Sequence, residues 1–185
     1  MTYLILDTET NGLPQLYDLP YTDTGNWPRL ISISWGLYDE AGHELNRDAQ
    51  MVQPDGYRWN LQAQRIHGIR PEEASEYGLP IQTVLTRLRS ALEAADAWVG
   101  HFIELDYNVI GAEFVRAGRV AEFVAKPTIC TMEASRHVAP GGSWQTLDEL
   151  YRTLFGKRMR NLHNAEADRL ATAQCFFELK RRGLL

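Results

Sequence analysis

The sequence predicts an α/β fold in which helices flank a mixed β-sheet. Two observations lead to this class: residues 2–54 hold strand-like runs joined by turn-rich segments, and residues 60–185 alternate helical periodicity with short apolar strands. Strands joined by a hairpin are antiparallel, whereas strands joined through a helix are parallel. We therefore expect three antiparallel strands followed by parallel ones. The chain shows no repeat, low-complexity tract or linker, so we expect a single domain over residues 1–185.

The first predicted strand covers residues 2–10, TYLILDTET. Side chains alternate along a strand, so its two faces carry Leu4, Leu6 and Thr8 on one side and Tyr3, Ile5, Asp7 and Glu9 on the other. The segment NGLP, residues 11–14, ends this strand. Residues 14–29 contain three prolines and no clear period, which predicts a long loop.

The later elements are predicted from helical periodicity and from strand-like apolar runs. Residues 30–54 predict two strands joined at 39–42, and residues 60–69 predict a short helix that ends near Gly68. Further helices, recognised by apolar spacing and by the glycines or caps at their ends, are expected at 79–96, 104–118, 146–156 and 164–182. Two short apolar strands are expected at 97–102 and 127–132.

Composition limits the function classes. The net charge of −5 argues against a protein that coats nucleic acid non-specifically, because such binding depends on many Lys and Arg contacts to phosphates. A nucleic-acid enzyme with one local basic groove remains compatible with this charge. No apolar run approaches the ~20 residues of a membrane helix, and we recognise no signal peptide or lipidation motif. Cys130 and Cys175 lie among apolar residues, which favours buried thiols in a reducing compartment and a cytoplasmic protein.

The acids Asp7 and Glu9 stand two residues apart at the end of the first strand, so both side chains point to the same side. Two interpretations are open. The pair is either an ordinary solvated strand end or part of a site for a hard divalent cation, which prefers oxygen ligands and would remove the repulsion.

Three further residues are ordinary when each is considered alone. Asp106 suits the first turn of a helix, Asp168 suits a solvated helix face, and His163 suits a loop. Together with Asp7 and Glu9 they form a pattern: D-x-E after the first strand, an aspartate after a later strand, and H-x₄-D at the start of the last helix.

This constellation resembles the DEDDh 3′–5′ exonucleases of the ribonuclease-H-like superfamily, which include ribonuclease T and the proofreading subunit of the bacterial replicative polymerase. The resemblance runs over almost the whole chain. It is carried by LDTETNGLP, AQRIHGI, TLDELYRTLFG and HNAEADRLAT. Three positions depart from the family's usual pattern, at Asn11, Phe102 and Leu105, and none of them is a metal ligand in the family.

The resemblance implies a ribonuclease-H-like mixed sheet and a two-metal mechanism. Asp7, Glu9, Asp106 and Asp168 would hold two Mg²⁺ or Mn²⁺ ions, and His163 would be the general base. The expected product is a nucleoside 5′-monophosphate released from a 3′ end. Single-stranded DNA is the expected substrate, with RNA left open.

Substrate contacts are expected in two places. The turn after the first strand and the IHGI segment would hold the terminal nucleotide through Asn11, Gly12, Leu13 and His67. A basic stretch ahead of His163 would either hold phosphates or form a solvated loop, and it contains Lys157, Arg158 and Arg160. The loop aromatics Tyr17, Tyr21 and Trp27 either stack on bases or fix the loop to the body, and His101 is expected to be structural.

Two other functions remain open. One is a nucleic-acid-binding module of the same fold with little activity. The other is a proofreading component of a polymerase complex. The chain ends seventeen residues after Asp168, which favours a stand-alone repair or RNA-processing enzyme over that component. Oligomeric state does not follow from the sequence.

Overall fold

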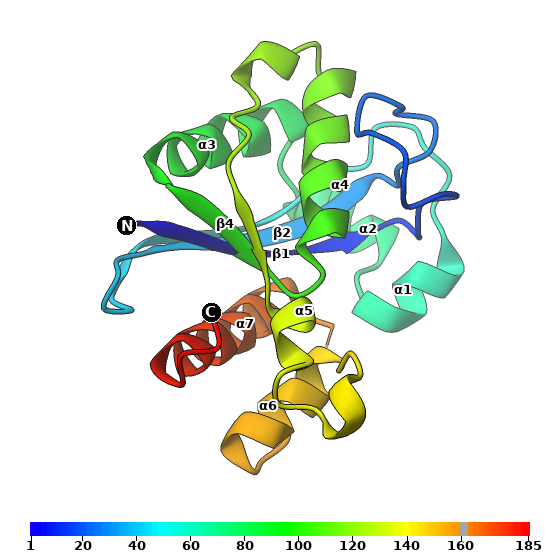
Figure 1. Ribbon diagram of the computed structural model, residues 1–185. Coiled ribbons are helices and arrows are strands. Elements are labelled where there is room, and N and C mark those ends of the chain that lie inside the picture. Colours follow the sequence, from blue (N-terminus) through cyan, green and yellow to red (C-terminus); the bar gives the residue numbers. More distant parts are fainter. Residues whose placement is uncertain (160–162) are drawn as a thin grey trace.

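The computed structural model of the protein describes residues 1–159 and 163–185. Its centre is a five-stranded sheet in the order β3-β2-β1-β4-β5 (Figure 1). The strands are β1 (Tyr3–Thr10), β2 (Leu30–Tyr38), β3 (Glu44–Met51), β4 (Ala97–Gly100) and β5 (Thr128–Cys130). The α-helices are α1 (Leu61–His67), α2 (Pro71–Tyr77), α3 (Ile81–Ala94), α4 (Ile103–Arg116), α5 (Thr131–Ser135), α6 (Leu147–Phe155) and α7 (Ala165–Arg181). Short 3-10 turns are η1 (Val120–Glu122) and η2 (Pro140–Gly142).

The sheet is mixed, as predicted. Strand β1 pairs antiparallel with β2, and β2 pairs antiparallel with β3, so the first three strands form a meander. On its other side β1 pairs parallel with β4, and β4 pairs parallel with β5. In the β1–β2 ladder Asp7 lies opposite Ser34 and Glu9 lies opposite Ser32.

The predicted alternation along β1 is confirmed by its packing. Leu4 and Leu6 belong to the core between the sheet and the helices α3 and α4, which lie above the sheet in Figure 1. Tyr3 and Ile5 face the opposite way and pack against α7, which lies below it. All four side chains are buried, so the first half of β1 is a rigid support for the acids that follow.

A third apolar cluster joins α5, α6 and α7 beneath the sheet. It includes Leu150 and Leu154 from α6 together with Cys175 and Leu179 from α7. Cys175 and the half-buried Cys130 are both free thiols, as predicted. In the described residues, no helix is long and apolar enough to cross a membrane.

The elements differ from the sequence prediction at three short segments. Strand β4 ends at Gly100 because Phe102 takes a left-handed backbone conformation, with φ of 70°, and begins α4. Strand β5 ends at Cys130, and α5 follows directly instead of further strand. Helix α2 was not predicted. Its seven residues are too few to show a period, although Pro71 occupies its first turn, a position that favours helix initiation.

The loop at 14–29 is fixed to the body by two of its aromatic residues. Trp27 is buried, and its Nε1 donates to the carbonyl of Pro20 at 3.1 Å. The ring of Tyr21 lies 4.9 Å from that of Phe123. Tyr17 is 41% exposed and lies against Phe102, so it alone of the three loop aromatics retains a large free surface.

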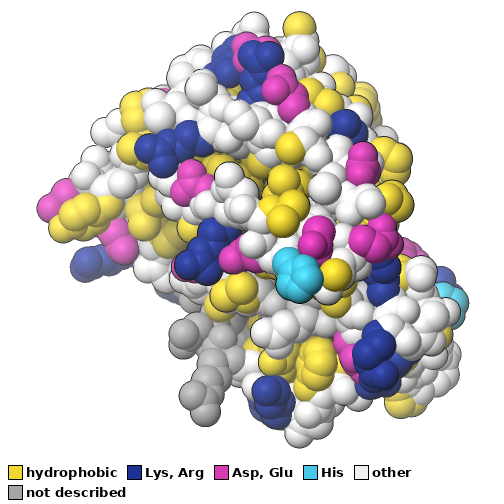
Figure 2. All heavy atoms as spheres, turned by 90° about the vertical axis from the view of Figure 1, so that its left-hand side faces the viewer, with side chains coloured by type: hydrophobic (Ala, Val, Ile, Leu, Met, Phe, Trp, Pro, Cys, Tyr) yellow, Lys and Arg dark blue, Asp and Glu magenta, His cyan; other side chains and the backbone are white. Residues whose placement is uncertain are grey.

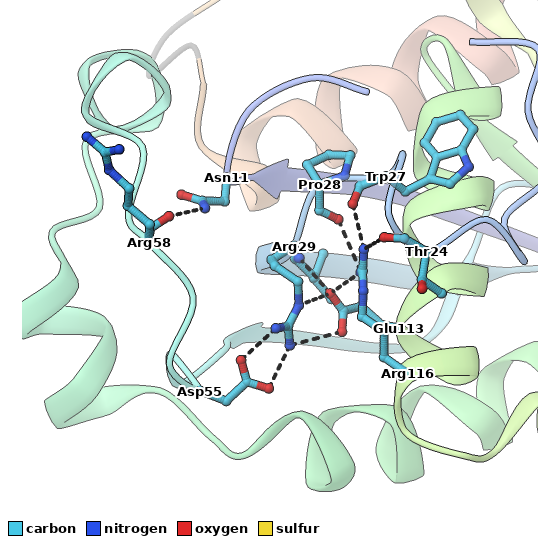
Figure 3. Close-up of polar contacts among 10 residues, drawn as sticks. Asn11, Thr24, Trp27, Pro28, Arg29, Asp55, Arg58, Glu113 and Arg116 are labelled. Carbon is cyan, nitrogen blue, oxygen red and sulfur yellow. Dashed lines mark hydrogen bonds and ion pairs between the residues drawn. The ribbon is translucent and has the colours of Figure 1, made fainter. Parts of the chain in front are cut away.

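A network of charged side chains completes the attachment of this loop, and we call Arg29, Asp55, Glu113 and Arg116 the loop clamp (Figure 3). Glu113 is 1% exposed and accepts hydrogen bonds from Arg29 Nε and Arg116 Nη1, both at 2.8 Å. Arg29 also pairs with Asp55 at 2.7 Å. Arg116 donates to three loop carbonyls, those of Thr24, Trp27 and Pro28. The clamp therefore joins α4, the loop and the segment after β3 with two positive and two negative groups.

Figure 2 shows one face of the molecule, turned by 90° from Figure 1. On this face Lys and Arg side chains are interspersed with Asp and Glu, and the described residues form no continuous basic band there. This distribution agrees with the net charge of −5.

Candidate active site

Four acidic side chains reach the same edge of the sheet from three elements. Asp7 and Glu9 lie in the second half of β1, Asp106 in the first turn of α4, and Asp168 in the first turn of α7. Because β1 and β4 are parallel, their carboxyl ends share one edge, and α4 begins just after β4. Helix α7 packs across β1 and brings its own first turn to that edge.

The four carboxylates form one cluster, which we call the carboxylate cluster. Asp7, Glu9 and Asp168 offer oxygen atoms that all lie within 4.8 Å of one another. Asp106 is 4% exposed and lies close enough to them that its charge raises the pKa of Asp7. Among the described residues no other group of three acids, histidines or cysteines converges in this way.

Thr8 is a member of the site that the sequence did not indicate. Its hydroxyl donates to Asp106 Oδ1 at 2.6 Å. The alternation of β1 contains the signal for this contact, because it turns Thr8 toward the face that α4 covers.

Burial raises the pKa of every carboxyl in the cluster. The pKa of Glu9 rises to about 8, first through burial and then through repulsion by Asp168 and Asp106. Burial raises the pKa of Asp106 to about 7 against the opposing hydrogen bond from Thr8. The pKa of Asp168 rises to about 6, also chiefly through burial. Asp7 shifts in the same direction, through burial and then through repulsion by its three neighbours.

Among the residues that the structure describes, the cluster has no counter-charge. None of the ion pairs in the described part of the chain involves one of its four carboxylates. Asp168 Oδ1 is buried and has no hydrogen-bond partner within residues 1–159 and 163–185. An all-oxygen donor set with an unpartnered buried atom fits a hard divalent cation such as Mg²⁺ or Mn²⁺.

His163 lies beside the cluster, just before the N-cap of α7. Its backbone N–H donates to Asp168 Oδ2 at 3.0 Å, and its φ of 61° is in the left-handed region. The side chain is exposed and lines the same pocket as Glu9. The backbone contact therefore holds the residue next to Asp168 while leaving its imidazole free.

A pocket of about 450 Å³ opens next to Glu9 and His163. It lies between the end of β1 and α1, and its size suits a small ligand. Of the predicted substrate contacts, Gly12, Leu13 and His67 line it. Asn60 and Ile66 also line it and were not predicted. Gly12 has a φ of 123°, a backbone conformation that favours glycine, and a Cβ there would also lie 2.9 Å from Asn60 Nδ2.

His67 lines this pocket with its ring held in one tautomer. Its Nδ1 accepts a hydrogen bond from the N–H of Ile69 at 3.0 Å, which places the proton of the neutral ring on Nε2. That Nε2 is buried and has no partner. Burial also lowers the pKa of His67, which favours this neutral form.

Asn11 is not among the residues that line the pocket. Its side chain donates to the carbonyl of Arg58 at 2.9 Å (Figure 3). It also accepts from the N–H of Asn60 at 2.8 Å. Asn60 in turn caps the N-terminus of α1. Asn11 therefore supports the pocket wall through protein contacts.

The predicted basic contacts lie elsewhere. Lys157 and Arg158 line a separate hollow of about 340 Å³ between α6 and α7, together with Tyr151 and Leu170. The structure does not bring these cations into the pocket with the carboxylates. The predicted contact at Arg160 lies outside the described residues.

His101 has a structural role, as predicted. Its ring nitrogens hydrogen-bond Thr131 Oγ1 and the carbonyl of Gln145, both at 3.0 Å. Burial lowers its pKa to about 4, so the ring stays neutral. His101 thereby links the start of α4 to α5 and to the segment before α6.

A sequence profile described as Exonuclease, of the ribonuclease T type, matches residues 4–176. The chain is 32% identical over 81 residues to DNA polymerase III subunit epsilon of Aquifex aeolicus. The aligned segment covers 44% of this chain and 39% of that protein.

Solved structures give the same fold. The zinc-bound complex of E. coli exonuclease I with single-stranded DNA has a TM-score of 0.81 at 20% identity, over 98% of this chain and 41% of that chain. Exonuclease I of Methylocaldum szegediense has a TM-score of 0.77 at 19% identity, over 98% of this chain and 40% of that one. The chain thus spans about two fifths of the length of these relatives.

The mixed sheet is therefore the ribonuclease-H-like exonuclease fold that the sequence predicted. The profile extends from the apolar start of β1 to α7 and so includes all four carboxylates and His163. The chain belongs to the exonuclease family.

Proposed function

We propose that the protein is a divalent-metal-dependent 3′–5′ exonuclease that releases nucleoside 5′-monophosphates from the 3′ end of a nucleic acid. One observation carries the proposal: four buried or half-buried carboxylates converge, and no cationic side chain among the described residues pairs with them. Membership of the exonuclease family supports the reaction class.

Asp7, Glu9, Asp106 and Asp168 would hold two Mg²⁺ or Mn²⁺ ions. When bound, such a pair stabilises the attacking and leaving oxygens of an in-line displacement at phosphorus and lowers the pKa of a water. The protein supplies the fixed positions: Asp7 and Glu9 extend from the rigid part of β1, and Thr8 orients Asp106 by its hydrogen bond.

His163 would accept the proton of the attacking water. The ordinary pKa of a histidine, about 6.5, suits proton transfer near neutral pH. Its backbone is fixed to Asp168, and its imidazole is exposed at the pocket beside Glu9.

The pocket beside the cluster would bind the terminal nucleotide. Leu13 is 71% exposed at its rim and can pack against a base, and His67, which lines the same pocket, would contact the nucleotide as well. Lys157 and Arg158 would contact phosphates further along the strand from the hollow between α6 and α7. Arg160 is likewise proposed to contact substrate phosphates.

Single-stranded DNA is the proposed substrate, because the structural relatives include exonuclease I bound to single-stranded DNA. RNA is the alternative substrate. A second candidate function, proofreading within a polymerase complex, is favoured by the similarity to DNA polymerase III subunit epsilon. A binding module with little activity is disfavoured because all five motif residues are present.

A 5′-labelled single-stranded DNA assay tests the proposal. We expect stepwise shortening from the 3′ end in Mg²⁺ or Mn²⁺, none in EDTA, and none with Asp7→Ala. Glu93→Ala, which removes a half-exposed acid on α3, is the matched control and should be fully active. Absence of shortening by the wild-type protein in either metal, with single- and double-stranded DNA and RNA, would refute the proposal.

A further inference from the structure

Helix α7 carries a fully buried arginine directly after the acid Asp168. Arg169 is 0% exposed. Arginine is almost never fully buried unless it is paired, so its partners show what the residue does. The proposed mechanism gives this residue no role. Its position raises the question of why a charged side chain enters the protein at this point.

The guanidinium of Arg169 is bound by the sheet beneath α7. Its Nε donates to Ser34 Oγ at 3.0 Å, and its Nη1 donates to Tyr38 Oη at 2.6 Å and to Glu44 Oε1 at 2.7 Å. Ser34 and Tyr38 lie on β2, and Glu44 begins β3. One side chain therefore attaches the first turn of α7 to two strands.

The sheet leaves space for this side chain at Gly36. A Cβ at Gly36 would lie 2.5 Å from Arg169 Nη1 and 2.7 Å from a ring carbon of Tyr38. A Cβ at this position would therefore displace the guanidinium or the Tyr38 ring. The contact is built by both elements and is not an incidental approach of a long side chain.

The contact connects two members of the carboxylate cluster. Arg169 follows Asp168 in α7, and its partner Ser34 lies directly opposite Asp7 in the β1–β2 ladder. The position of α7 over the sheet determines how far Asp168 lies from Asp7 and Glu9. A shift of α7 along the sheet would change the spacing of the three oxygens that now lie within 4.8 Å.

The charge of Arg169 does not neutralise the cluster. It pairs with Glu44 at 2.7 Å, and none of its ion pairs reaches Asp7, Glu9, Asp106 or Asp168. Its effect is therefore geometric. Arginine suits such a role better than lysine, because its planar fork donates in several fixed directions at once.

From these contacts we infer that Arg169 is a positioning residue that holds α7 on the sheet so that Asp168 stays within metal-binding distance of Asp7 and Glu9. The inference rests on the proposed function, because it assumes that the cluster binds divalent cations.

Binding of Mn²⁺ to the full chain without nucleic acid, followed by calorimetry, tests the inference independently of activity. We expect Arg169→Met to weaken Mn²⁺ binding about 10–100-fold, as for other residues that orient metal ligands. Arg169→Lys keeps the charge but not the fork, and it should also bind Mn²⁺ more weakly. The control is Arg119→Met, which removes a largely buried arginine that joins α3 and η1 far from the cluster. It should lower the melting temperature and leave Mn²⁺ affinity unchanged.

Gly36→Ala gives a second test that keeps every partner of Arg169. Its Cβ should displace the guanidinium and weaken Mn²⁺ binding in the same direction, and it decides the matter if Arg169→Met does not fold. Wild-type Mn²⁺ affinity in folded Arg169→Met, or in Gly36→Ala, would overturn the inference. So would full affinity in Arg169→Lys, because charge alone would then suffice. If the wild-type protein binds no Mn²⁺, the proposed function itself fails, which is a different result from equal binding by wild type and variants.

Discussion

The carboxylate cluster and the loop clamp are both buried groups of charges next to α4, and they are built in opposite ways. The clamp contains two arginines and two acids, and its innermost member Glu113 receives hydrogen bonds from both arginines. The cluster contains four acids, and no Lys or Arg among the described residues pairs with them. The described residues supply counter-charges for the clamp and none for the cluster.

The pKa directions express the same difference. In the clamp, the hydrogen bond from Arg29 lowers the pKa of Asp55. In the cluster, burial and repulsion raise the pKa of Glu9 to about 8. Removing one partner of a buried ion pair destabilises the fold, whereas buried charges left without a partner mark a candidate site for something that binds. Changes in the clamp should therefore affect stability, and changes at the cluster should affect activity and metal binding.

The largest expected effect is on catalysis. Replacing His163 with alanine should lower the exonuclease rate about 10²–10⁴-fold, because it removes the proposed general base. Mn²⁺ affinity should stay near the wild-type value, since the four carboxylates are intact. Single-turnover rates across pH 6–9 measure this effect. Full activity of His163→Ala over that range would show that another group takes the proton.

The next effect is on the clamp. Glu113→Gln should lower the free energy of unfolding by about 3–5 kcal/mol, because it leaves buried arginine charge without its partner. Urea denaturation measures this loss. The matched control is Asp55→Asn, whose side chain is 48% exposed and whose loss should cost no more than about 1 kcal/mol. Equal losses in the two variants would contradict the central position given to Glu113.

The smallest expected effect is a difference in how the contributions of the cluster and the clamp to folding stability depend on pH. Folded-state pKa values of about 6, 7 and 8 for Asp168, Asp106 and Glu9 lie above their ordinary values, so the folded protein binds more protons than the unfolded chain between about pH 4 and pH 8. The cluster's contribution to stability is therefore lost as the pH rises through this window when metal is absent. The clamp acts oppositely, because Asp55 has a lowered pKa and loses its contribution on acidification.

Urea denaturation in EDTA at pH 5 and pH 8 checks this prediction. Glu9→Gln should gain stability relative to wild type at pH 8 and show little difference at pH 5. An equal difference in unfolding free energy between the two proteins at both pH values would mean that the fold does not raise the pKa of Glu9.

The sequence predicted the fold well where long elements carry a clear period. The apolar start of β1, the 79–96 helix and the final helix all show such patterns, and their order predicted a mixed sheet. Helices α2 and α5, with seven and five residues, are too short to show one. The end of β4 depends on the left-handed backbone of Phe102, which residue type alone does not indicate.

The site was predictable in its residue types but not in its supports. Motif spacing grouped the four acids with His163, whereas their convergence follows from the crossing of α7 over β1. Arg169 resembles an ordinary helix cation in the sequence, and its partners lie 125 to 135 residues away. Asn11 stays a predicted substrate contact, and its two side-chain bonds to residues 58 and 60 were not foreseen because they join segments about 50 residues apart.

Calorimetric titration of Mn²⁺ into the metal-free protein at pH 7 tests the central claim most directly. We predict about two ions bound per chain, with protons released because the ligating carboxylates must be ionised. Asp7→Asn should bind the ions far more weakly, and Glu113→Gln should bind them as the wild-type protein does. Absence of binding at millimolar Mn²⁺, or unchanged binding by Asp7→Asn, would contradict the conclusion that the carboxylate cluster is a cation site.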